Sequence, residues 1–134
     1  MSDKLNMILQ GLLVNPVIEE YDEAGWHVVK YANGRAEATL MEEVQISSGD
    51  SVFPMAGWYY GVHVTDIPAT IIGAFTQIQN VAGELVNKVP NANYLITVNT
   101  YEMTEQKHYF RVAITTANDY WTYMKKIVIT GKWK

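Results

Sequence analysis

The sequence predicts an all-β domain, an antiparallel β-sandwich of about seven or eight strands preceded by one short N-terminal helix. Three observations support this prediction. Short aromatic and β-branched runs recur from Trp26 to the end of the chain. Clusters of Asn, Gly, Asp and Pro separate these runs at short spacing, as turns between strands do. No segment after residue 24 has the periodicity of an amphipathic helix.

Residues 1–24 are expected to form a short helical stem and a linker, and residues 25–134 the β domain. The stem follows from Leu5, Ile8 and Leu12, which recur at helical spacing and form one apolar stripe. The same three residues fit the a and d positions of a heptad, so the helix packs either on its own domain or on copies of itself. Residues 15–25 are polar and predict the linker.

The predicted strands follow in order at residues 26–31, 35–46, 58–64, 70–81, 94–103, 108–115 and 121–133. Asn33-Gly34 predicts a tight hairpin between the first two, because both residue types tolerate positive φ. Gly73 is interpreted as a bulge within its strand. Residues 85–93 are expected to be a loop or an edge segment around Pro90.

The composition argues against several classes of protein. A net charge of −4 does not favour binding to nucleic acid or to an anionic membrane surface. The chain has no cysteine, which excludes disulfides and thiolate sites. No run approaches the roughly 20 apolar residues of a membrane span. The first residues do not resemble a signal peptide, so we expect folding in a cytosol.

Catalytic signatures are absent from the sequence, and we predict no catalytic residue, no metal and no cofactor. His27, His63 and His108 lie on different predicted strands and are expected to be separate, half-exposed residues. His63 and Asp66 can be combined with a loop serine as a hydrolytic triad, but any chain of this length offers such trios. Glu42 and its neighbour Glu43 point to opposite faces of a strand and cannot share a substrate.

Two aromatic clusters are the candidate ligand surface. Exposed aromatic rings beside amides and carboxylates suit a saccharide, whose C–H faces stack on a ring while its hydroxyls form hydrogen bonds. The predicted ligand residues are Asn118, Asp119, Tyr120 and Trp121, with Trp58 and Tyr60 second. The alternative is that these rings pack in the core or in a subunit interface, where aromatics bury large areas.

The two ends of the β region resemble a known family. The opening carries a Trp26…Lys30-Tyr31-x-x-Gly34-x-x-Glu37 hairpin, and the chain closes on Gly131-Lys132-Trp133-Lys134. This pattern resembles the C-terminal domains of tail-fibre, baseplate and minor tail proteins of tailed bacteriophages and prophages. Within it, Glu37 is expected to pair with Lys30 or Lys132, and Trp133 to cover the core.

The resemblance implies a β-sandwich that forms a parallel homotrimer at a fibre tip, with Leu5, Ile8 and Leu12 in the trimer interface. It implies adhesion to a host cell-surface saccharide, contact with other tail or baseplate proteins, and a place in the virion tail after assembly in the host cytoplasm. The alternatives are a small phage-encoded glycan hydrolase or lyase, or a purely structural module that trimerises or caps the tail.

Overall fold

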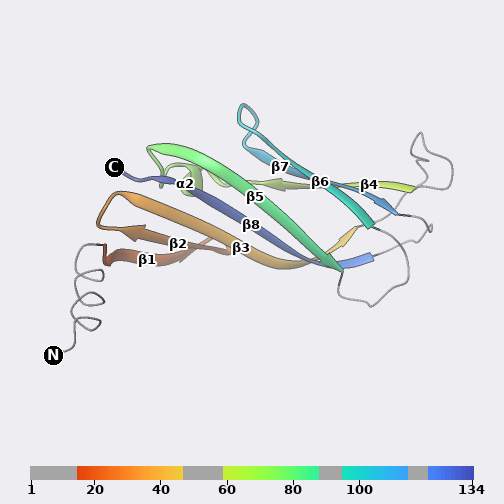
Figure 1. The fold of residues 1–134 in the computed structure, drawn as a ribbon, viewed down its shortest axis with the longest axis horizontal. Coiled ribbons are helices and arrows are strands. Elements are labelled where there is room, and N and C mark those ends of the chain that lie inside the picture. Colours follow the sequence, from red (N-terminus) through yellow and green to blue (C-terminus); the bar gives the residue numbers. More distant parts are fainter. Residues whose placement is uncertain (1–14, 47–58, 88–94, 115–120) are drawn as a thin grey trace, which may run out of the picture.

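The structure is a computed structural model that describes residues 15–46, 59–87, 95–114 and 121–134. These residues form eight strands and one short helix, and every strand pairing is antiparallel, which confirms the all-β class (Figure 1). In chain order the elements are β1 (Val17–Glu23), β2 (Trp26–Tyr31), β3 (Arg35–Ile46), β4 (Tyr59–Asp66), α2 (Ala69–Ile72), β5 (Gln77–Asn87), β6 (Leu95–Glu102), β7 (Lys107–Ile114) and β8 (Trp121–Lys132). The predicted stem residues Leu5, Ile8 and Leu12 lie outside the described residues.

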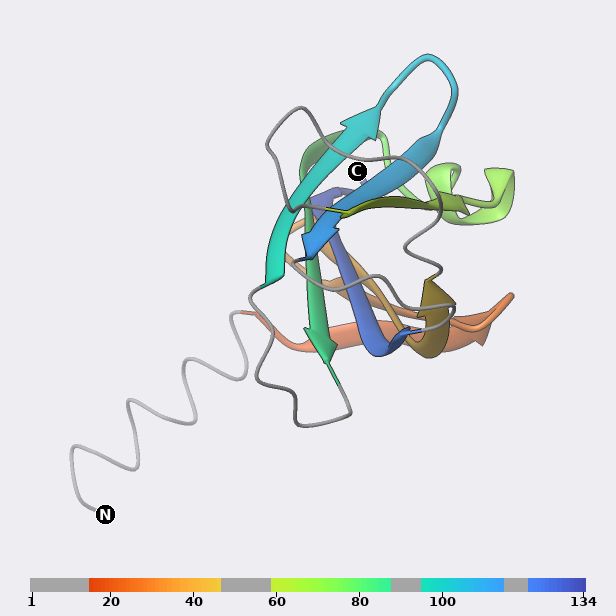
Figure 2. The same ribbon diagram turned by 90° about the vertical axis from the view of Figure 1, so that its right-hand side faces the viewer.

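The strands divide into two sheets. A five-stranded sheet has the order β1-β2-β3-β8-β5, and a three-stranded sheet has the order β4-β7-β6. Figure 2 shows the smaller sheet lying across one face of the larger sheet. The long strands β3 and β8 pair along their whole length, from Arg35 opposite Lys132 to Ile46 opposite Trp121.

One apolar core fills the space between the sheets, and both sheets and α2 contribute to it. The inward residues of β8 show the alternation of a half-buried strand, since Tyr123, Ile127 and Ile129 are all buried. The full core cluster is Trp26, Val28, Ala38, Leu40, Ile67, Ile71, Ala74, Leu85, Phe110, Val112, Tyr123, Ile127 and Ile129. Lys125 occupies one of the same inward positions of β8, and it is the polar exception within this row.

The predicted hairpin at Asn33-Gly34 is confirmed, with a three-residue turn. Gly34 alone of the pair has positive φ, at 93°. Its backbone N–H donates to the carbonyl of Tyr31 at 3.0 Å, and Asn33 Oδ1 accepts from the backbone N–H of Arg35 at 3.0 Å. This is the arrangement in which a turn closes on a left-handed residue and the asparagine side chain supports it.

The prediction of a linker over residues 15–25 was wrong. Residues 17–23 form β1, an edge strand that pairs with β2. Its side chains are almost all exposed, so it lacks the alternation that identifies a half-buried strand. The turn to β2 is Ala24-Gly25, with φ of 51° and 85°, a two-residue hairpin turn that usually has Asn or Asp in place of alanine.

The strand predicted over residues 70–81 was also wrong. The short helix α2 occupies its first part, and β5 begins only at Gln77. Gly73 ends the helix at φ −67° and is not a bulge; the irregularity in β5 lies between Ile78 and Asn80. β5 then continues to Asn87, into the region expected to be a loop.

The first hairpin and the last strand, which carry the resemblance described above, meet at one end of the larger sheet, where Arg35 lies opposite Lys132. Gly131 is required there, because a Cβ at this position would collide with the backbone carbonyl of Gln77 in β5. The expected pairing of Glu37 with Lys30 or Lys132 was wrong, since Glu37 Oε1 accepts from Arg35 Nη2 at 2.9 Å. Trp133 is half-buried and donates from Nε1 to the carbonyl of Tyr31 at 2.7 Å.

Candidate functional site

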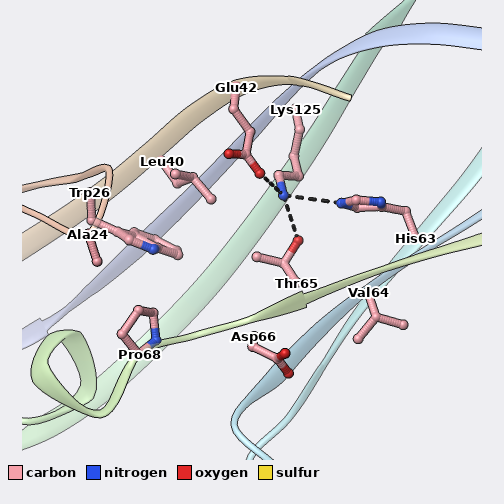
Figure 3. Close-up of a pocket in the computed structure, with 10 residues that line it drawn as sticks. All are labelled: Ala24, Trp26, Leu40, Glu42, His63, Val64, Thr65, Asp66, Pro68 and Lys125. Carbon is pink, nitrogen blue, oxygen red and sulfur yellow. Dashed lines mark hydrogen bonds and ion pairs between the residues drawn. The ribbon is translucent and has the colours of Figure 1, made fainter. Parts of the chain in front are cut away.

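A pocket of about 280 Å³ opens between the two sheets, and we call it the inter-sheet pocket. Figure 3 shows its lining side chains, which converge from both sheets and from the segment before α2. They are Ala24, Trp26, Leu40, Glu42, His63, Val64, Thr65, Asp66, Pro68 and Lys125. The lining combines apolar walls with four ionisable groups, which is the composition of a site for a small polar ligand.

Lys125 lies at the base of this pocket and is 1% exposed. Its ammonium donates to Glu42 Oε1 at 2.5 Å, to Thr65 Oγ1 at 2.8 Å and to His63 Nε2 at 3.1 Å. An ammonium has three N–H donors, so these contacts use all of them. Burial of a charge is costly unless it is paired and hydrogen-bonded, and the network meets that requirement.

The network joins the two sheets. Lys125 in β8 and Glu42 in β3 are direct cross-strand partners within the larger sheet. His63 and Thr65 come from β4 of the smaller sheet, two residues apart and therefore on the same face. Lys125 thus fixes the Glu42 carboxylate from one side and holds β4 against the larger sheet from the other.

His63 is held in its neutral form with a defined tautomer. Its Nε2 accepts from Lys125, so the proton of the neutral ring is on Nδ1. Burial lowers the pKa of His63 below 6.5, and the neighbouring Lys125 ammonium lowers it further. His63 therefore presents one N–H donor and no charge at neutral pH.

His108 lies on β7 opposite Thr65 of β4 and is completely buried. It contacts Phe110 edge-on, with ring centroids 4.4 Å apart, and its ring lies so close to Gly83 that a Cβ there would be 2.6 Å from it. Burial, with smaller effects of Lys125 and His63, lowers the pKa of His108 to about 4. Its Nε2 is 3.4 Å from Asn99 Oδ1, and its Nδ1 has no hydrogen-bond partner within the described residues.

Two carboxylates lie at the rim of the inter-sheet pocket. The Glu42 side chain is 49% exposed, and only its Oε1 is shown bound to Lys125. The Asp66 side chain is 82% exposed and has Lys107 Nζ at 3.8 Å from its Oδ1. Asp66 alternates with Thr65 on β4, and Figure 3 shows its carboxylate on the side of the strand away from Lys125, so Glu42 is the carboxylate that a ligand in the pocket can reach.

A second hollow, of about 420 Å³, has a different character. Among the described residues that line it, Tyr101 alone has an ionisable side chain, and about half of the others are apolar. It is lined by Ile72, Phe75, Thr76, Gln77, Ile78, Tyr101, Met103 and Gln106. It has no fixed charge with which to orient a polar ligand, and the inter-sheet pocket is the better candidate site.

The structure describes none of the side chains that the sequence predicted to bind the ligand. Asn118, Asp119, Tyr120 and Trp58 lie outside the described residues. Tyr60 and Trp121 are placed only as backbone positions of β4 and β8. The prediction of an aromatic ligand surface at these six positions therefore stays a prediction.

The three histidines differ from the separate half-exposed residues that we expected. His27 is exposed and hydrogen-bonds Asp22 and Glu20, whereas His63 and His108 both face the space between the sheets. In the described part of the chain, no group of three His, Cys, Asp or Glu side chains could hold a metal ion.

Sequence reasoning missed Lys125 and the pocket around it. One signal was available, because Lys125 interrupts the alternation of apolar residues in β8 at an inward position. A lysine there predicts a buried acidic or polar partner. The sequence did not identify Glu42, His63 and Thr65 as that partner, because they come from two other strands.

Comparisons with protein-family models, with curated proteins and with solved structures found no match to this chain. Among the described residues, no helix is both long enough and apolar enough to cross a membrane.

Proposed function

We propose that this chain is a non-enzymatic saccharide-binding domain at the tip of a tail fibre or baseplate of a tailed bacteriophage or prophage. In this proposal the two sheets form a β-sandwich, three copies assemble in parallel, and the virion tail carries the domain to a host cell-surface glycan. The family resemblance of the first hairpin and the last strand supports the assignment to the tail. The inter-sheet pocket is the observation that supports saccharide binding.

The pocket suits a sugar because its polar groups are already fixed. Lys125 holds the Glu42 carboxylate and the His63 ring in place, so a ligand does not have to order them. The Glu42 carboxylate accepts hydrogen bonds from hydroxyls, and His63 Nδ1 donates one. Leu40 and Pro68 provide apolar wall for the C–H face of a ring.

A glycan array probed with the whole protein tests this function. We expect a saccharide hit that Glu42→Gln weakens about tenfold, the effect of losing one charge-assisted hydrogen bond. Folding should be retained, because glutamine keeps an oxygen that accepts from Lys125. The matched control is Glu84→Gln, which removes an exposed carboxylate from β5 outside the pocket. If Asp119→Ala weakens the hit and Glu42→Gln does not, the saccharide binds at the turn predicted from the sequence.

Trimer formation is tested separately. Light scattering of the whole chain at micromolar concentration should give a mass of about three chains. Ile8→Asp should lower this mass while the β signal in circular dichroism persists, because burial of each such side chain stabilises by roughly 1.5–3 kcal/mol. A monomer at all concentrations would contradict the fibre-tip assignment.

A glycan hydrolase or lyase is the second candidate, because Glu42, Asp66 and His63 all line one pocket. A general acid must reach the leaving group through a carboxyl oxygen, whereas Glu42 Oε1 is occupied by the buried ammonium of Lys125. Release of reducing ends or unsaturated sugars from host polysaccharide would favour the enzyme. Trimer formation without any glycan hit would favour the purely structural module.

A further inference from the structure

The hydrogen bonds of Lys125 determine which charge a ligand can carry. A lysine in a pocket is usually a sign of an anionic ligand, because an ammonium binds carboxylates and phosphates. Here Glu42, Thr65 and His63 accept all three of its N–H donors, at 2.5, 2.8 and 3.1 Å. A ligand can reach this cation only by displacing one of them.

No other cationic side chain is among the described residues that line the pocket. Its rim instead carries the carboxylate of Glu42, whose side chain is 49% exposed and which accepts hydrogen bonds from hydroxyls. His63 adds a single neutral donor at Nδ1. The described lining therefore offers one accessible acceptor, one neutral donor and no free cationic donor, which suits an uncharged polyol better than an anion.

We propose that the inter-sheet pocket takes an uncharged sugar residue and rejects sugar acids such as uronic acids. This inference rests on the proposed saccharide-binding function and specifies its ligand class. The selectivity comes from the saturated ammonium of Lys125 and from the accessible carboxylate of Glu42. A cation with a free donor in the same place would give the opposite preference.

The test compares sugars that differ only in a carboxylate. The isotope-labelled whole chain is titrated at pH 7.5 with glucose, galactose and mannose, and in parallel with glucuronic, galacturonic and mannuronic acids, and backbone NMR shifts are followed. We expect at least one neutral sugar to shift the resonances around Glu42, His63 and Thr65. Its acid counterpart should bind at least tenfold more weakly.

A variant that frees one donor of Lys125 isolates the cause of the selectivity. Thr65→Val removes one of the three acceptors of the ammonium and keeps the side-chain shape, so the ratio of neutral-sugar to uronic-acid affinity should fall several-fold. Glu84→Gln is the control and should change neither titration. A residue that only maintained the fold would not alter the ratio of the two affinities.

The outcomes separate this inference from the function on which it rests. Equal or tighter binding of the uronic acid at these resonances would overturn the ligand class and leave saccharide binding standing. If neither series shifts the pocket resonances, while the glycan array gives a hit that Glu42→Gln leaves unchanged, the pocket is not the binding site and both proposals for it fail.

Discussion

Replacement of Lys125 with methionine is expected to lower the free energy of unfolding by about 3 kcal/mol, because it removes one partner of a buried ion pair. Methionine keeps most of the side-chain volume, so the loss reflects the missing ammonium and not a cavity. It would leave the hydroxyl of Thr65 and Nε2 of His63 without their donor, and Glu42 without its cation. Urea unfolding followed by tryptophan fluorescence measures the change.

Two further variants show whether the network is the cause. Lys126→Met removes an exposed charge from the next position of the same strand and should change stability by less than about 0.5 kcal/mol. Lys125→Met combined with Glu42→Leu replaces the pair by apolar groups, and it should recover stability to within about 1 kcal/mol. Equal stability of Lys125→Met and the wild type would show that the inter-sheet bonds contribute nothing.

Acid should destabilise the fold through His108, by about 3 kcal/mol between pH 6.5 and pH 4. The folded state keeps this buried ring neutral, with a pKa of about 4, whereas the unfolded chain takes up the proton near its ordinary value of 6.5. Stability is therefore fully present above pH 6.5 and falls as the pH drops through this range. His63, whose pKa is also lowered, acts in the same direction.

The measurement is urea unfolding at pH 7, 5.5 and 4 for the wild type and for His108→Leu. The leucine has no titrating group, so the stability of the variant should fall less over this range, and the difference isolates His108 from the carboxylates. His27 has the opposite sign, because its hydrogen bonds to Asp22 and Glu20 raise its pKa. Parallel pH profiles of the two proteins would contradict the assignment to His108.

The inter-sheet pocket and the acid response share one structural origin. Lys125, His63 and His108 lie between the two sheets, where each is a potential positive charge with few ways to be hydrated. The space between the sheets holds the positive charge of Lys125, because the carboxylate of its cross-strand partner Glu42 pairs with it. The same arrangement that keeps His63 neutral as a hydrogen-bond donor for a ligand makes the domain sensitive to acid.

The sequence by itself determined the all-β class and the elements whose signals are local. The β2–β3 hairpin was predicted at its observed bounds, because alternation and the Asn33-Gly34 turn are properties of neighbouring residues. The β6–β7 hairpin was predicted with its turn at residues 104–107, and the structure places this turn one residue earlier, at residues 103–106. β1 was missed because an exposed edge strand carries no alternation and its turn uses Ala24 at positive φ.

Only the tertiary structure decided the short helix and the site. Ile71 and Ile72 have β-branched side chains that favour a strand, yet this segment is helical and buries Ile71 in the core, since packing overrides propensity. Lys125 acquires its role from Glu42, His63 and Thr65, which are 83, 62 and 60 residues away in the chain. No local pattern contains that information, because a buried charge is stabilised by whichever acceptors the fold brings to it.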